Sequence, residues 1–363
     1  MKTILLIGNT GKNKTLNGQT VKVRLYRDTL LKEKVPFKFI ELNDFSHHPF
    51  SILIKIAKEI KRCDRIVLIT AQRGTRLLIP FINFINKKYK KPFVLPMIGI
   101  SILHKYVDSL NEIDHYNFMN NCDFKNIRPK KQDIEQLKRI TWILPENKSV
   151  KNVIVNFFGL KNVDVLENFR DFDTLTKNNK FYNGYLNVIY LSRITKKKGI
   201  FELIEIVKKI NKDIVKIKLD IFGEFYLTNS EIKLFSSRLD DNIRYLGAID
   251  NDKVVETISA YDLFVFPTLY KSEGTPGVIA ESFIAGVPIL SSDFIQASSL
   301  MENNHNSIIY SPATKEELEK GFITLLDNKK LDFLANNIKH ENLKYSYSYN
   351  RMNFLHFICG CDD

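Results

Sequence analysis

The stretch 263–290 carries two glutamates, Glu273 and Glu281, with seven residues between them. It opens with an apolar run of strand length over 263–266, and a polar loop rich in glycine and proline follows. A short helix is predicted over 278–285, because a Gly and a Pro close the run in the order typical of helix ends. One carboxylate therefore lies in the loop, and the other lies on the helix that the loop begins.

The loop residues Thr275, Pro276 and Gly277 lie at the start of this predicted helix. Free backbone N–H groups at a helix N-terminus favour an anionic group such as a diphosphate, and glycine lets the backbone approach a ligand closely. Glu273 and Glu281 can accept hydrogen bonds from hydroxyl groups on either side of that diphosphate. A diphosphate flanked by two sugars is a nucleotide sugar, which is the ligand that this pattern indicates.

A second basic loop has the same character. Arg193 and Lys198 follow a predicted strand over 187–192 and precede a predicted helix over 199–210. A strand that runs through a basic loop into a helix N-terminus is a phosphate site in physical terms. The alternative interpretation is a lysine-rich exposed turn, which is how we interpret Lys196 and Lys197.

The string SEGTPGVIAESFIAGVPIL resembles the E-x7-E signature of the retaining glycosyltransferases of family 4, of the type that builds bacterial surface polysaccharides. The spacing of Arg193 and Lys198 is similar to that of the diphosphate-binding pair of this family. The resemblance covers residues 187–327 through sequence motifs. In the first half of the chain it rests on the alternation of strands and helices and on Gly18. It implies the GT-B fold, in which two Rossmann-like α/β domains face each other across a cleft.

The resemblance also implies a role for each residue. Arg193, Lys198 and the amides of 275–277 would stabilise the negative charge of the departing diphosphate. Glu281 would hold the ribose hydroxyls, and Glu273 would orient the hydroxyls of the donor sugar. Glu273, Arg193 and Lys198 are thus the predicted catalytic residues. The family uses the nucleoside diphosphate sugar as co-substrate, and we expect no metal, no other cofactor and no dedicated nucleophile.

Three further residues are candidates through the resemblance. Gly18, at the start of a helix predicted over 19–34, matches a glycine that contacts the donor in the loop after the first strand. Gly223 follows a predicted strand and stands where family members bring backbone near the nucleotide. His104 follows another strand, and some members have a histidine near the transferred sugar there. The residues that flank His104 do not match, so a structural histidine is the preferred interpretation.

The order of the predicted elements gives the domain organisation. Strands alternate with helices along the chain of 363 residues, which predicts parallel sheets covered by helices on both faces. We assign 1–166 to an acceptor-binding domain, 167–186 to a linker and 187–344 to a nucleotide-sugar-binding domain. Residues 345–363 are predicted to form a helix that crosses back to the first domain. In the first half, strands are predicted over 3–8, 37–42, 65–70, 93–100, 140–144 and 163–166, and helices over 19–34, 49–62, 75–89, 106–119 and 146–158.

The net charge of +13 is confined to the first half of the chain. Residues 1–165 contain 30 Lys+Arg and 14 Asp+Glu, and residues 166–363 contain 24 and 27. The segment 77–93 joins Phe and Ile residues to four lysines, and 128–139 predicts a second basic helix. Such segments bind anionic membrane surfaces, with each lysine contributing roughly 1 kcal/mol. We therefore expect a lipid-linked acceptor at a membrane, and an ordinary amphipathic helix with a solvated lysine face is the alternative for either segment.

No stretch of the sequence is apolar enough to predict a signal peptide or a membrane span. The four cysteines lack the spacing of metal ligands and indicate reduced thiols. We expect a cytoplasmic protein, peripheral on the inner face of the cell membrane.

The sequence thus predicts a retaining hexosyltransferase that takes a sugar from a nucleoside diphosphate sugar, with a UDP-sugar as the expected donor. The expected acceptor is a glycan or lipid-linked glycan in capsule, O-antigen or exopolysaccharide synthesis. One alternative is another GT-B enzyme that acts on a nucleotide sugar or sugar phosphate, such as a phosphorylase or epimerase. A nucleic-acid-binding protein is the second alternative, but the aromatic residues of the basic half follow core periodicity and are not interleaved with the basic ones as stacking on bases requires. We therefore expect no nucleic-acid partner.

Overall fold

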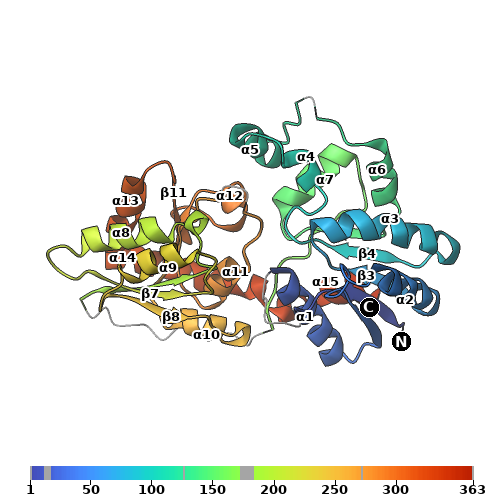
Figure 1. Ribbon diagram of the computed structural model, residues 1–363, viewed down its shortest axis with the longest axis horizontal. Coiled ribbons are helices and arrows are strands. Elements are labelled where there is room, and N and C mark those ends of the chain that lie inside the picture. Colours follow the sequence, from blue (N-terminus) through green and yellow to red (C-terminus); the bar gives the residue numbers. More distant parts are fainter. Residues whose placement is uncertain (1, 12–17, 126, 172–183, 271–272, 362–363) are drawn as a thin grey trace. The chain divides into compact units, whose positions relative to one another are not determined.

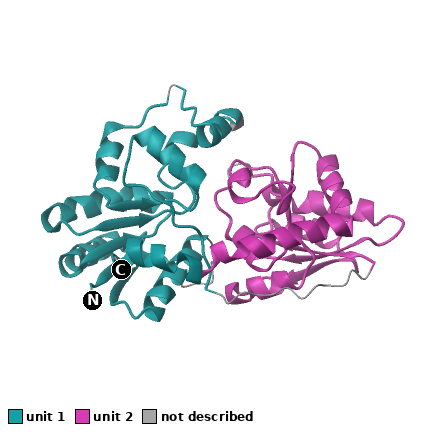
Figure 2. Cartoon of the chain, turned by 180° about the vertical axis from the view of Figure 1, so that it is seen from behind, with its two compact units in different colours: residues 1–171, 347–363 teal, residues 172–346 magenta. Residues whose placement is uncertain are grey.

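The computed structural model describes residues 2–11, 18–125, 127–171, 184–270 and 273–361. The chain divides into two compact units, Met1–Asp171 with Tyr347–Asp363, and Phe172–Ser346 (Figure 2). Residues 172–183 of the expected linker lie outside the described residues. No helix in the described parts of the chain has the length and the apolar character that crossing a bilayer requires.

Unit 1 contains a parallel five-stranded sheet in the order β2-β1-β3-β4-β5 among its described residues (Figure 1). Its strands are β1 Ile4–Gly8, β2 Phe37–Glu41, β3 Arg65–Leu68, β4 Phe93–Pro96 and β5 Trp142–Leu144. Its helices are α1 Gly18–Lys32, α2 Pro49–Arg62, α3 Gln72–Tyr89, α4 His104–Val107, α5 Glu112–Asn120, α6 Lys131–Lys138, α7 Lys148–Phe158 and α15 Tyr347–Phe354. Every residue of β1 and β3 is buried, as expected for central strands covered on both faces.

Two predictions in this half are wrong. Residues 163–166 do not form a strand, because Val163 makes only an isolated bridge to Ile143. The helix predicted over 106–119 is instead two helices, α4 and α5. They are separated at Asn111, whose side chain accepts a hydrogen bond from the Asp114 N–H and caps α5.

The C-terminal helix α15 belongs to unit 1, as predicted. Phe354 packs edge-on against Tyr26 of α1, with ring centroids 5.1 Å apart. Arg351 donates two hydrogen bonds to the Glu33 carboxylate, at 2.9 and 2.7 Å, and the Tyr347 hydroxyl donates a third at 2.7 Å. The end of the chain is therefore fixed to α1 by an aromatic contact, and to Glu33 directly after α1 by hydrogen bonds and an ion pair.

Unit 2 contains a parallel six-stranded sheet in the order β11-β10-β9-β6-β7-β8 among its described residues. Its strands are β6 Leu186–Leu191, β7 Ile217–Phe222, β8 Ile243–Gly247, β9 Leu263–Phe266, β10 Ile289–Ser292 and β11 Ser307–Tyr310. Its helices are α8 Ile200–Ile210, α9 Asn229–Ser236, α10 Val254–Ser259, α11 Gly277–Ile284, α12 Ala297–Leu300, α13 Lys315–Leu325 and α14 Asn328–Glu341. Residues of α8 and α13 share one core with the sheet, and residues of α10 and α11 share the other.

Candidate functional site

The strand order of unit 2 defines its ligand edge. From β6 the chain proceeds to β7 and β8 on one side, and then returns to β9, β10 and β11 on the other. The order in which successive strands are added therefore reverses between β6 and β9, which lie side by side and are parallel. In open α/β sheets, ligands bind at the carboxyl ends of the strands at such a reversal. The loops that follow β6 and β9 are those that carry the predicted residues.

Gly199 brings these two loops together. It has a φ of +70°, which favours glycine, and a Cβ at this position would lie 1.8 Å from the Pro267 carbonyl oxygen. No other residue fits this close approach of two backbones. The main chain adds a hydrogen bond from the Leu269 N–H to the Lys197 carbonyl, at 2.8 Å. The residue before Gly199 is therefore held against the end of β9.

That residue is Lys198, whose ammonium group forms an ion pair with the Glu273 carboxylate. The Thr268 hydroxyl donates a second hydrogen bond to the same carboxylate oxygen, at 3.0 Å. The side chains of Lys198 and Glu273 are only 13% and 11% exposed, and the ammonium group lies 5.1 Å from the centroid of the Phe266 ring. Because so little water screens these charges, their interactions are stronger than those of a surface pair.

Thr268 is a site residue that the sequence analysis missed. It is buried, and its carbonyl accepts a hydrogen bond of 2.6 Å from the Ser292 hydroxyl at the end of β10. Its own hydroxyl accepts a bond of 3.2 Å from the Tyr270 N–H. A threonine two residues after a strand is a weak signal by itself. Its role follows from the fold, which places it between Glu273 and the neighbouring strand.

The predicted diphosphate loop leads into α11. Thr275, Pro276 and Gly277 are half-buried, and the helix begins at Gly277. Pro276 occupies the N-cap position and makes no side-chain capping bond, so a ligand oxygen can approach the N–H groups of the first turn. Glu281 lies one turn further along α11 and is half-buried. This arrangement has the features expected of an anion site with a carboxylate beside it.

Arg193 lies on the same β6–α8 connection as Lys198 but has a different environment. Its side chain is exposed, and its guanidinium lies 5.5 Å from the centroid of the Tyr226 ring. Gly223, at the end of β7, has a φ of +142°, and a Cβ there would lie 1.8 Å from the Ser192 carbonyl oxygen. The end of β7 thus packs directly on the loop that carries Arg193. Tyr226 is a second neighbour that the sequence did not indicate.

In unit 1, Gly18 opens α1 and is exposed. A Cβ would meet nothing within 4 Å there, so packing does not require a glycine. Residues 12–17 of the preceding loop lie outside the described residues. The described start of that loop is held by Arg24, which donates hydrogen bonds of 2.7 and 3.1 Å to the carbonyls of Thr10 and Gly11.

His104 is the first residue of α4 and is about one-third exposed, with its Nδ1 3.5 Å from the Asp108 carboxylate. His115, on α5, is buried. Burial and the nearby charge of His104 lower the pKa of His115. The proximity of His104 to a sugar stays a prediction.

A buried ion pair at the ligand edge of unit 1 was also missed. The Lys22 ammonium donates to the Glu146 carboxylate at 2.8 Å and to the Met97 carbonyl at 2.7 Å. The other Glu146 oxygen accepts from the Gly99 N–H at 3.1 Å. The pair fixes the segment that follows β4. Since 123 residues separate the two partners, no local pattern could reveal it.

Comparison with known proteins identifies a matching family and similar proteins. Residues 171–342 match the model of the family described as Glycosyl transferases group 1. An uncharacterized glycosyltransferase of Methanocaldococcus jannaschii is 24% identical over 226 residues, which are 60% of this chain and 54% of that protein. The poly(ribitol-phosphate) alpha-N-acetylglucosaminyltransferase of Staphylococcus aureus is 22% identical over 236 residues, which are 64% of this chain and 46% of that protein. The chain thus spans about half the length of these relatives.

The whole chain is also similar to solved structures. Anabaena HepE, crystallised with UDP and glucose, superposes with a TM-score of 0.70 and 14% identity, and covers 99% of this chain and 100% of its own. At this identity the likeness shows a shared fold. The predicted fold class, two parallel-sheet α/β domains of the GT-B type, is confirmed.

Proposed function

We propose that this protein is a retaining glycosyltransferase that uses a nucleoside diphosphate sugar, with a UDP-sugar as the favoured donor. The observation that carries the proposal is the cluster of Lys198, Glu273 and Thr268 at the carboxyl ends of β6 and β9, between which the strand order of unit 2 reverses. The start of α11, which has no side-chain cap, follows in the same loop. The family match over residues 171–342 and the UDP bound to HepE support the proposal.

The reaction breaks the bond between the anomeric carbon and the diphosphate oxygen, and that oxygen keeps the electron pair. The acceptor hydroxyl forms the new bond from the same face, and its proton passes to the departing diphosphate. Lys198, Arg193 and the amides of 275–277 would stabilise the charge that collects there, as fixed donors do without reorganisation. The ion pair with Glu273 holds the Lys198 ammonium group in position.

Glu273 and Glu281 act on the two sugars of the donor. Glu273 orients the hydroxyls of the transferred sugar, and Glu281 accepts hydrogen bonds from the ribose. Gly18 and Gly223 would let backbone approach the donor, and a structural role is the preferred interpretation of His104. These fixed cations and amides supply the positive charge that a metal ion supplies elsewhere, so we propose that transfer needs no metal.

We propose that unit 1 meets an anionic membrane that carries a lipid-linked or glycan acceptor. Helices α2 and α3 pack against each other, and both expose large apolar side chains beside lysines. Phe50 and Ile54 of α2 are 80% and 57% exposed, and Leu77 and Phe84 of α3 are 59% and 76% exposed. Each pair lies on one side of its helix. Apolar side chains beside lysines fit an anionic lipid surface.

Sedimentation with vesicles tests the membrane contact. The protein should pellet with phosphatidylglycerol vesicles more than with phosphatidylcholine vesicles, and Phe84→Ser should weaken this binding. Phe333 of unit 2 is 49% exposed, so Phe333→Ser is the matched control. Equal losses in the two variants, or equal binding to both lipids, would refute the membrane role of unit 1.

Product analysis tests the transfer. UDP release should be measured from UDP-glucose, UDP-galactose and UDP-N-acetylglucosamine, with a membrane lipid extract as the acceptor source and with EDTA present and absent. One donor should be consumed at the same rate with and without EDTA, and the proton coupling at the anomeric carbon of the product should match that of the donor. An inverted product would exclude the retaining mechanism, and a sugar phosphate or an epimerised nucleotide sugar would indicate the alternative enzyme classes.

A further inference from the structure

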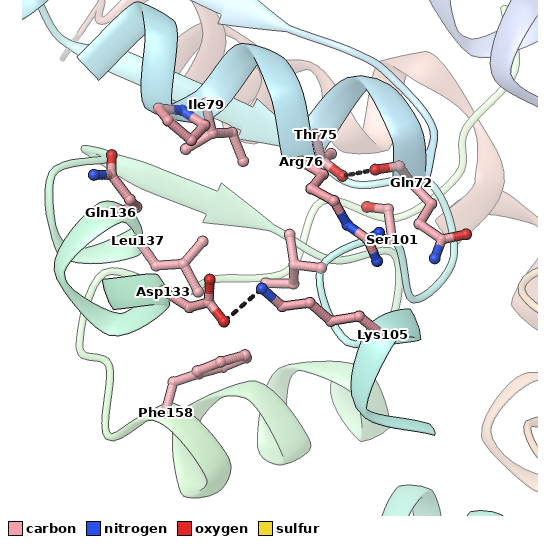
Figure 3. A pocket seen from close by; sticks show the side chains of 12 residues that line it. Gln72, Thr75, Arg76, Ile79, Ser101, Lys105, Asp133, Gln136, Leu137 and Phe158 are labelled. Atoms are coloured by element: carbon pink, nitrogen blue, oxygen red, sulfur yellow. Dashed lines mark hydrogen bonds and ion pairs between the residues drawn. The ribbon is translucent and has the colours of Figure 1, made fainter. Parts of the chain in front are cut away.

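A cavity in unit 1 lies outside the residues assigned above. It encloses about 80 Å³ between α3, the segment 101–105 and α6 (Figure 3). A bound water needs only about 10–15 Å³ of such space, so there is room for a functional group of several heavy atoms. Because α3 follows β3 and the segment 101–105 follows β4, the cavity is built on the connections that leave the ligand edge of the sheet.

The polar lining of the cavity has one excess positive charge. Arg76 and Lys105 are its cations and Asp133 is its one carboxylate. Lys105 pairs with Asp133 at 2.5 Å, whereas no ion pair among the described residues involves Arg76. Figure 3 shows Arg76, Ser101 and Lys105 among the side chains that line the cavity. Two cations and one anion leave a sum of +1, which one singly charged anion would balance.

Ser101 supplies an independent indication of a ligand. It lines the cavity and is 7% exposed, and its hydroxyl oxygen is buried without a hydrogen-bond partner among the described residues. A buried polar group without a partner destabilises the folded state, and a bound ligand can remove that cost. A ligand oxygen in the cavity can accept this hydrogen bond. The opposite wall is apolar, with Ile79, Leu137 and Phe158, and suits the C–H face of a sugar or polyol.

We propose that this cavity is an acceptor subsite for a glycan unit that carries one anionic group, a carboxylate or a phosphodiester. The inference rests on the proposed transferase function and names the class of its acceptor. Arg76 binds two anionic oxygens with its planar fork, and Ser101 donates to one of them. Asp133 accepts a hydrogen bond from a hydroxyl of the same unit, and Lys105 then bridges Asp133 and the anion.

Paired probes of matched shape test the subsite by NMR titration of the whole protein. Methyl β-glucuronide should bind at least tenfold more tightly than methyl β-glucoside, which lacks only the charge. Diethyl phosphate, in the second arm, tests a phosphodiester, and the tighter of the two anionic probes identifies the source of the anion. Equal binding of glucuronide and glucoside, together with no binding of diethyl phosphate, would overturn the proposal.

Variants separate binding from folding. Arg76→Gln should weaken the anionic probe about tenfold, whereas Arg73→Gln should not, because Arg73 is exposed on the same helix but does not line the cavity. Ser101→Ala should weaken the probe and yet leave the protein at least as stable, because it removes an unpartnered hydroxyl. Equal effects of Arg76→Gln and Arg73→Gln would overturn the assignment.

UDP affinity is measured in parallel to distinguish the two proposals. Arg76→Gln should leave it unchanged. Anion binding in a protein that binds no nucleotide would refute the transferase function and leave an anion site of another purpose. Nucleotide binding without anion discrimination would refute the subsite alone.

Discussion

Replacing Lys198 with methionine tests the role of the buried ion pair. The substitution keeps the length of the side chain and removes its charge, so the Glu273 carboxylate, 11% exposed, loses its cation. Breaking a fully buried pair costs 3–5 kcal/mol, but the Thr268 hydrogen bond remains, so we expect a loss of about 2–3 kcal/mol. For a unit of this size, that corresponds to a melting temperature lower by about 5–10 °C.

The double variant Lys198→Met/Glu273→Gln should regain most of that stability, because neither charge is then buried alone. It should not regain donor binding. A charge-assisted hydrogen bond to the diphosphate contributes about 1.5–3 kcal/mol, so UDP affinity should fall about ten- to a hundredfold in the single and double variants alike. Calorimetric titration and thermal unfolding measure the two quantities.

Lys197→Met is the matched control, because Lys197 is the exposed neighbour on the same turn. It should change the free energy of unfolding by less than about 0.5 kcal/mol. The reasoning is refuted if the double variant binds UDP as tightly as the wild type. It is also refuted if the single and double variants are equally unstable.

Three further predictions concern residues that support the fold of the two units. Gly199→Ala should abolish UDP binding or prevent folding, because its Cβ would lie 1.8 Å from the Pro267 oxygen, and soluble yield with UDP titration measures both. His115 has a lowered pKa in the folded state, so the unfolded chain binds its proton first, and stability should fall as the pH drops below about 6.5. Urea unfolding at pH 7.5 and 5.5 should show this loss in the wild type and a smaller loss in His115→Phe. Arg351→Ala should lower the melting temperature slightly and speed hydrogen exchange over 347–359, because it removes two hydrogen bonds to the Glu33 carboxylate.

Strands and helices could be predicted where residues that end such elements, such as proline, flank the apolar run. Helix α2 and strand β9 have the predicted bounds, because Pro49 and Arg62 bound the apolar periodicity of α2 and Pro267 ends β9. Helices α9 and α14 were missed. In α9 a readable signal was present, since Thr228 and Glu231 form a capping box. The strand predicted over 163–166 does not form, because this short segment, with three apolar residues and Asp164, makes only one bridge.

The site could be predicted as a set of residues but not as a geometry. The sequence placed Lys198 and Glu273 in separate motifs with separate partners on the ligand. The fold instead binds them to each other, across 74 intervening residues, because β6 and β9 are neighbours in the sheet. Lys22 and Glu146 form a similar long-range pair. Such partners depend on strand order, which local patterns do not contain.

A thermal-shift measurement with UDP tests the central claim most directly. At one hundred times its dissociation constant, UDP should stabilise the wild type by about 2.7 kcal/mol. Arg193→Ala and Glu281→Ala should lose most of that shift, because they remove the proposed hydrogen-bond donor to the diphosphate and the proposed acceptor for the ribose hydroxyls. If neither UDP nor GDP, TDP, ADP or CMP raises the melting temperature of the wild type, the proposal that unit 2 binds a nucleotide sugar is wrong.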